Sequence, residues 1–155
     1  MAFELKTGTF KPEGDIPSRY TCDGENLSPS LQWEDAPVAT KSFALISDDP
    51  DAPMGTWVHW VVYDIPPTAH QFSEGIPSSA TISDGSKQGI TDFGRPGYGG
   101  PCPPHGKPHR YYFKLYALDT MLNLPLKQTK TDLVQAMQGH ILATAKLMGK
   151  YERKR

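Results

Sequence analysis

Acids and histidines gather in two stretches of this chain, residues 48–60 and residues 97–111. Carboxylates, imidazoles and phenols can exchange hydrogen bonds and protons with a polar ligand. Each stretch contains prolines that stiffen its backbone, and each adjoins an apolar run typical of a strand. We therefore expect the two stretches to build one small polar pocket on a rigid scaffold. The side chains that would carry its chemistry are Asp49, Asp51, His59, His109 and Tyr111.

The spacing of the second stretch predicts which side chains face the pocket. His109 and Tyr111 are two residues apart, so on a strand they share a face, while Arg110 points to the other. An imidazole beside a phenol suits an anion or a polar head group. Asp49 and Asp51 have the same spacing, and at least one could enter the pocket. The alternative is that one of these acids caps a turn or pairs with Arg110.

For several other residues in the two stretches, the sequence does not decide between a role in the pocket and a structural role. A lone histidine such as His59, on the apolar run 57–65, is more often a core residue than a ligand. Gly99, Gly100 and Pro101 would contribute backbone that lets a ligand approach closely. Cys102 lies near His105, but the sequence identifies no residue that would orient such a nucleophilic pair.

The sequence lacks the motifs of several common site types. It has neither a GxGxxG fingerprint nor a GK[ST] phosphate loop, so nucleotide binding has little support. It has no GxSxG nucleophile elbow. Asp49, Asp51, His59 and His109 are acceptable metal ligands, but their spacing is not diagnostic. We predict no metal and no cofactor, and we expect a binding protein more than an enzyme.

Size and charge narrow the classes further. The 155 residues suit one domain, spanning 1–155, and the net charge of −1 favours neither nucleic acid nor a membrane surface. The sequence shows neither a signal peptide nor a membrane span, so the default location is cytoplasmic. Cys22 and Cys102 would be free thiols in a reducing cytosol, but they could pair if the fold brings them together.

Most of the chain reads as short strands. Apolar runs predict strands over 42–47, 57–65 and 111–118, and residues on both faces of 57–65 are apolar, as in a central buried strand. One helix is predicted over 132–147 from apolar residues at three- and four-residue spacing. Thr129 or Thr131 would cap its start and Gly149 would end it. Residues 66–100 carry no strong periodic signal.

At these motifs the chain resembles the phosphatidylethanolamine-binding protein family, also called Raf-kinase-inhibitor-like, in its short bacterial and archaeal branch. The matching segments cover almost the whole chain and occur in order. They are 20–33, which begins Tyr-Thr-Cys-Asp-Gly; 47–64, with the Asp-Pro-Asp-Ala-Pro run; 97–118; and 136–151.

The resemblance implies a mostly β fold, an antiparallel β-sandwich with Greek-key topology and a C-terminal α-helix. It places a small anion pocket on Asp49, Asp51, His59, Gly99, Gly100, Pro101, His109 and Tyr111. The ligand would be a small anion or a phosphorylated head group. The implied role is anion or phosphate-group binding, with a regulatory function through a kinase or protease partner, and the implied assembly is a homodimer. The alternative is a hydrolase that uses an Asp–His pair in the same pocket.

Overall fold

The computed structural model describes residues 2–153, which fold into two antiparallel β-sheets and one α-helix. A three-stranded sheet has the order β1-β2-β5, and a five-stranded sheet has the order β6-β4-β3-β7-β8. The strands are β1 (Glu4–Lys6), β2 (Leu31–Glu34), β3 (Ser42–Asp49), β4 (Trp57–Ile65), β5 (Gln71–Phe72), β6 (Lys87–Gln88), β7 (His109–Leu118) and β8 (Ile141–Tyr151). The helices are the 3-10 turn η1 (Ser18–Tyr20) and α1 (Lys130–Met137).

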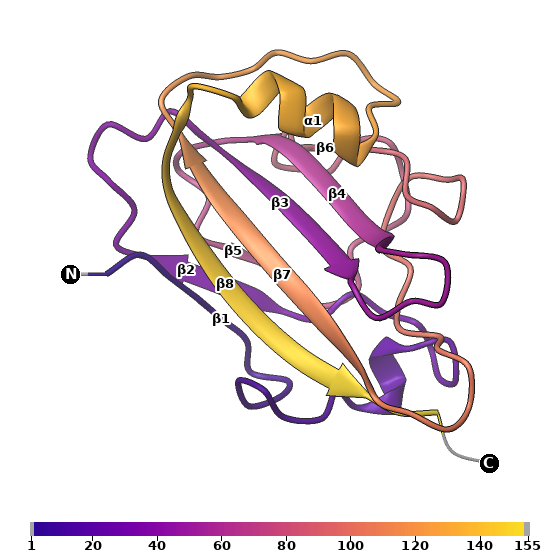
Figure 1. Ribbon diagram of the computed structural model, residues 1–155. Coiled ribbons are helices and arrows are strands. Elements are labelled where there is room, and N and C mark those ends of the chain that lie inside the picture. The colour runs from indigo at the N-terminus through magenta and orange to yellow at the C-terminus, as the bar shows by residue number, and fades with distance from the viewer. Residues whose placement is uncertain (1, 154–155) are drawn as a thin grey trace.

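The five-stranded sheet is the middle layer of the molecule (Figure 1). On one face it packs against the smaller sheet, with Trp33 and Phe72 from that sheet meeting Phe43 and Trp60. On the other face, α1 and the segment before it cover a second cluster that includes Ala44, Ile46, Val61, Leu133 and Met137. β3 and β4 are therefore buried on both faces, as the apolar run 57–65 predicts. The mostly β, antiparallel fold with one helix is confirmed, and the strand orders are compatible with the Greek-key expectation.

The predicted helix is right at its start and wrong at its end. Thr129 caps α1: its Oγ1 accepts from the Asp132 backbone N–H at 3.2 Å, and the Asp132 carboxylate accepts from the Thr129 N–H at 3.0 Å. The helix ends at Met137, and residues 141–151 form β8, which pairs with β7 along its length. Gly149 is not a helix terminator, because it lies in β8 where a Cβ would meet Ile16 and Phe10 at 2.6 and 2.7 Å.

β4 does not alternate strictly between its two faces. Its register against β3 shifts between Ser47 and Asp48, where Ser47 pairs with Trp60 and Asp48 pairs with Val58, so His59 is the extra residue of a β-bulge. The bulge turns His59 toward Tyr111, whose ring belongs to the cluster between the sheets. Strict alternation would have placed His59 with Val61, on the opposite face.

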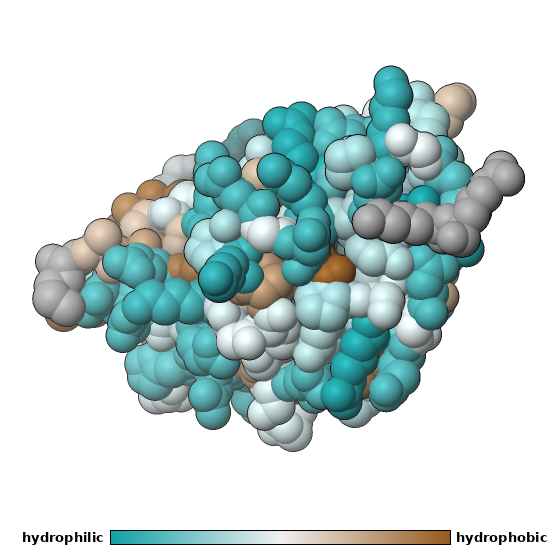
Figure 2. Space-filling view, turned by 90° about the horizontal axis from the view of Figure 1, so that it is seen from below, coloured by the Kyte–Doolittle hydropathy of each residue, from teal (hydrophilic) through white to brown (hydrophobic). Residues whose placement is uncertain are grey.

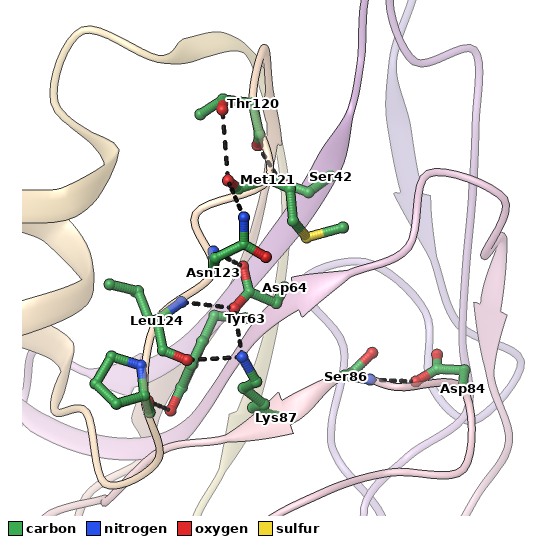
Figure 3. Close-up of polar contacts among 11 residues, drawn as sticks. Ser42, Tyr63, Asp64, Asp84, Ser86, Lys87, Thr120, Met121, Asn123 and Leu124 are labelled. Atoms are coloured by element: carbon green, nitrogen blue, oxygen red, sulfur yellow. Dashed lines mark hydrogen bonds and ion pairs between the residues drawn. The ribbon is translucent and has the colours of Figure 1, made fainter.

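A buried carboxylate fastens the connection between β7 and α1. Asp64 at the end of β4 accepts the backbone N–H groups of Asn123 and Leu124, each at 2.9 Å, and an ion pair from Lys87 at 3.0 Å (Figure 3). The Tyr63 hydroxyl adds a bond to the Pro125 carbonyl at 2.6 Å. These contacts hold residues 119–125 over the helix side of the sheet and are structural.

Cys22 and Cys102 form a disulfide with Cα atoms 5.4 Å apart. This settles the alternative that the sequence left open, because the fold brings the two thiols together. Disulfides persist in oxidising compartments and in the interiors of hyperthermophiles, so a cytoplasmic location stays a prediction. No helix within residues 2–153 is long and apolar enough to cross a membrane. Seen from below, the surface is mostly hydrophilic, with hydrophobic residues showing in a few places between the polar ones (Figure 2).

Candidate functional site

The two stretches singled out in the sequence meet at one end of the five-stranded sheet. β3 runs antiparallel to both β4 and β7, so its last residue, Asp49, lies beside the first residues of those strands. A cavity of about 320 Å³ opens there. Its lining combines a few polar groups with aromatic and proline walls: Asp49, Ala52, Pro53, Trp57, His59, Phe93, Cys102, Pro103, Pro104, His109 and Tyr111.

Asp49 fixes the orientation of His109. Its Oδ2 lies 2.7 Å from His109 Nδ1, and both side chains are buried. Its Oδ1 accepts the Asp51 backbone N–H at 2.7 Å, which holds the carboxylate in place. A carboxylate can only accept here, so His109 Nδ1 carries a proton and Nε2 is the ring nitrogen left for a ligand.

Gly99 holds His59 in the same way from the loop opposite. The Gly99 carbonyl lies 2.6 Å from His59 Nδ1, and the Gly99 N–H donates to the His59 carbonyl at 2.9 Å. A side chain at position 99 would collide with the Phe93 ring, since a Cβ would lie 2.4 Å from it. Burial lowers the pKa of His59, against the opposing effects of the Gly99 carbonyl and Asp49.

Tyr111 places a phenol between the two histidines. Its ring stacks on His109 at 6.4 Å and meets the edge of His59 at 5.2 Å. Its hydroxyl is buried without a hydrogen-bond partner among the described residues. Burial raises the pKa of Tyr111, and the negative charge of nearby Asp49 adds to the rise, although the pair lies outside hydrogen-bonding geometry. The hydroxyl therefore stays protonated as a potential donor.

The remaining loop residues support the cavity from behind. Gly100 donates its N–H to Asn26 Oδ1 at 2.8 Å, and the Pro101 carbonyl accepts from Cys22 N–H at 3.1 Å. Neither of these two residues, nor Gly99, lines the cavity itself. Together with the disulfide at Cys102, these contacts tie the cavity wall to residues 20–26.

Asp51 lies outside the cavity. Its carboxylate forms a two-pronged ion pair with the Arg110 guanidinium, at 2.8 and 2.9 Å, and also accepts the Arg110 N–H at 2.9 Å. Hydrogen bonds from Arg110 lower the pKa of Asp51 to about 2. Arg110 faces away from His109 and Tyr111, as the strand spacing predicts. For Asp51 the geometry supports the alternative prediction, which is an ion pair with Arg110.

Phe93 is the wall residue that sequence reasoning missed. Its ring contacts Trp57 at 5.6 Å and His59 at 5.4 Å, both edge-on. It lies in the stretch 66–100, where the apolar residues show neither the strand nor the helix spacing that could have predicted its position. The only local signal is an aromatic residue just before Gly94, within a loop.

The described residues provide neither a cluster of metal ligands nor a free cysteine that could act as a nucleophile. Across residues 2–153, no cluster of three or more His, Cys, Asp or Glu side chains is placed to hold a metal ion. Cys102 is committed to the disulfide, so it has no thiolate for attack in this state.

Known proteins resemble this chain along nearly its full length. The family model described as phosphatidylethanolamine-binding protein matches residues 6–152. A UPF0098 protein of Methanothermobacter thermautotrophicus is 54% identical, over 96% of this chain and 98% of its own length. One from Aquifex aeolicus is 52% identical, over 97% of this chain and 88% of its own.

Two solved structures share the fold. The homologue CT736 from Chlamydia trachomatis, described as a phosphatidylethanolamine-binding protein homologue, has a TM-score of 0.90 and 42% identity, with 99% of each chain covered. YbcL from E. coli, described as a new member of the mammalian family, has a TM-score of 0.92 and 35% identity, with 99% of this chain and 100% of YbcL covered. With the motifs, the fold and these relatives in agreement, the chain belongs to the phosphatidylethanolamine-binding protein family.

Proposed function

We propose that the chain binds a small anion, such as a phosphate group, in the cavity at the end of β3. The observation that carries this proposal is the pair of imidazoles that line the cavity, those of His59 and His109, each held at Nδ1 so that Nε2 is left for a ligand. Buried polar groups are nearly always paired, so ring nitrogens without a partner at a cavity suit a ligand atom as their partner. Tyr111 lines the same cavity, and its buried hydroxyl has no partner among the described residues.

Calorimetric titration of inorganic phosphate into the full chain tests the proposal. We expect binding to the wild type and a loss of at least about tenfold in affinity for His109→Ala, the range expected for losing a hydrogen bond to a charged group. His140→Ala is the matched control. His140 also pairs with an aspartate, Asp119 at 2.8 Å, but beyond the far end of β7. Absence of phosphate binding at millimolar concentrations, or an equal loss in both variants, would refute an anion site here.

A hydrolase is the second candidate, and the Asp49–His109 hydrogen bond is what favours it. Such a pair can serve as a general base toward a water molecule. A panel of phosphomonoesters, phosphodiesters and carboxylic esters, assayed on wild type, His59→Ala and His109→Ala, distinguishes the two candidates. We expect no turnover from a binding pocket. Turnover by wild type that both variants lose would establish the hydrolase.

Regulation through a kinase or protease partner, and assembly as a homodimer, are further proposals for the same protein. The long segment 66–100 contributes only the short strands β5 and β6 and is otherwise loop, which suits contact with a partner. Native mass spectrometry of freshly purified chain would measure the number of copies and the mass of any ligand retained. A monomeric mass would contradict the homodimer without affecting the anion site.

A further inference from the structure

We infer that the cavity selects oxyanions that keep an O–H group, because His59 presents a lone pair to the ligand at Nε2. This inference rests on the proposed function and narrows its ligand class. The preferred ligands would be hydrogen phosphate and singly protonated phosphate monoesters. Sulfate and phosphodiesters, which carry no O–H at neutral pH, would be disfavoured.

The hydrogen bond to Gly99 fixes the tautomer of His59. A backbone carbonyl has no proton to give, so the 2.6 Å contact requires the proton to be on Nδ1. The return bond from Gly99 N–H to the His59 carbonyl, at 2.9 Å, holds the two residues in register. A neutral imidazole has one N–H, so Nε2 is left as an acceptor.

The surroundings of His59 keep its ring neutral. It is 4% exposed and lies edge-on to the rings of Phe93 and Tyr111, at 5.4 and 5.2 Å. Charging an imidazole in so dry a setting is costly unless a carboxylate is bonded to it. The lowered pKa that burial gives His59 agrees with this geometry.

The nearest acids favour a charged ring, but each is held by a partner other than His59. Their influence on His59 is therefore exerted without a direct bond. Asp48 accepts from Lys130 Nζ at 2.7 Å, Asp49 from His109 Nδ1 at 2.7 Å, and Asp92 from the Val58 N–H at 2.7 Å.

His59 lines the cavity. Its Nδ1 is held by the Gly99 carbonyl, and its Nε2 has no hydrogen-bond partner in the described part of the chain. Nε2 is therefore the ring nitrogen that is left for a ligand atom.

His59 thus makes a demand that an oxyanion without a proton cannot meet. The lone pair at its Nε2 needs a proton from the ligand. Hydrogen phosphate has such a proton to give. Sulfate matches it in shape and charge but can bind His59 only if the ring first takes up a proton from solvent.

The test compares inorganic phosphate with sulfate by calorimetry at neutral pH, with dimethyl phosphate as a diester probe. We expect phosphate to bind at least about tenfold more tightly than sulfate, as for other sites that leave a buried polar group unpaired with the wrong ligand. Dimethyl phosphate should bind as weakly as sulfate. Equal affinities for phosphate and sulfate would overturn the inference and leave the anion site standing. Binding of neither anion would overturn the proposed function itself.

A variant isolates the nitrogen in question. His59→Asn keeps an amide donor near the position of Nδ1, toward the Gly99 carbonyl, but has no atom at Nε2. We expect the phosphate-to-sulfate ratio to fall to within about threefold, mainly through weaker phosphate binding. An unchanged ratio would contradict the role of Nε2.

The ligand-free wild type gives a test that does not depend on the variant folding. The histidine ring-nitrogen resonances of isotope-labelled protein report directly which nitrogen is protonated. We expect His59 to carry its proton on Nδ1 alone at neutral pH. A protonated Nε2 would overturn the inference.

Discussion

At the scale of single residues, the cavity is defined by what each polar atom already contacts. One carboxylate oxygen of Asp49 accepts a hydrogen bond from His109, and the other accepts one from a backbone N–H. The Gly99 carbonyl accepts a hydrogen bond from His59 Nδ1. Tyr111, which lines the same cavity, has a buried hydroxyl without a partner among residues 2–153. The ligand would complete this set of hydrogen bonds.

Replacing Tyr111 by phenylalanine should separate binding from stability. Removing an unpaired buried hydroxyl should leave the free energy of unfolding unchanged or raise it by up to about 1 kcal/mol. The same change should weaken phosphate binding by about tenfold or more, because the ligand loses a donor. Urea denaturation and calorimetry measure the two effects.

The neighbouring tyrosine provides the control for that experiment. Tyr112 faces the other side of β7, where its hydroxyl accepts a hydrogen bond from Arg110 Nη1 at 3.5 Å. Tyr112→Phe should leave phosphate affinity unchanged. A marked loss of stability in Tyr111→Phe would show that the hydroxyl has a partner within the protein after all.

His59 also makes stability depend on pH. Because burial lowers its pKa in the folded state below the ordinary 6.5, the unfolded chain binds a proton more readily. This contribution to stability is complete above about pH 6.5 and is lost as pH falls through the folded pKa. In phosphate-free buffer, the urea midpoint should fall between about pH 7.5 and about pH 5, and fall less for His59→Asn. Identical pH profiles would show that His59 titrates alike in both states.

Residue spacing predicted part of this geometry. The two-residue spacing of His109 and Tyr111 gave their shared face and the outward face of Arg110, since β7 is regular there. The same spacing failed for Asp49 and Asp51, because the strand ends at Asp49 and Asp51 lies in the turn. Strict alternation also failed at His59, where a bulge breaks it.

At the scale of elements, the antiparallel order explains why distant stretches meet. The end of β3 must lie beside the beginnings of β4 and β7, so Asp49, His59 and His109 converge without any long-range signal in the sequence. The helix was harder to delimit. Met137, Ile141, Ala145 and Met148 continue a helical spacing past Gly139, but β8 buries the alternating set Ala145, Leu147 and Gly149 instead. Small residues hid that alternation, and pairing with β7 decided the outcome.

The start of α1 offers a clean test of local stabilisation. Thr129→Ala removes the half of the capping box that the Thr129 side chain makes, the Oγ1 that accepts from the Asp132 N–H, and should cost about 1 kcal/mol of unfolding free energy. Thr131→Ala, within the exposed first turn, is the matched control and should change stability by no more than about 0.5 kcal/mol. Urea denaturation of both variants decides. Equal costs would mean that the cap contributes nothing beyond helix propensity.

At the scale of the whole molecule, one covalent bond joins the N-terminal region to the cavity wall. The disulfide spans a sequence separation of 80 residues, and Cys102 lines the cavity. The large loop it closes restricts the unfolded chain, and bonds of this kind typically contribute about 2–4 kcal/mol. The motifs of the family predicted the cavity, but spacing alone could not show that these cysteines pair.

Removing that bond should affect stability and binding together. Cys22→Ser combined with Cys102→Ser should lower the unfolding free energy by about 2–4 kcal/mol and weaken phosphate binding, because residues 99–104 lose an anchor. Thermal unfolding and calorimetry on oxidised wild type and the double variant measure both. Unchanged phosphate affinity would show that the hydrogen bonds of Gly100 and Pro101 hold the wall unaided.

The same cross-link changes how damage to the backbone would be seen. Every peptide bond between Cys22 and Cys102, including those of the long loops of residues 66–100, lies inside the covalent ring. A single proteolytic cut there would leave the two fragments joined, with strands from both still paired in the same sheets. Such a nicked molecule would run at full mass on a non-reducing gel and would separate into two pieces only after a reductant is added.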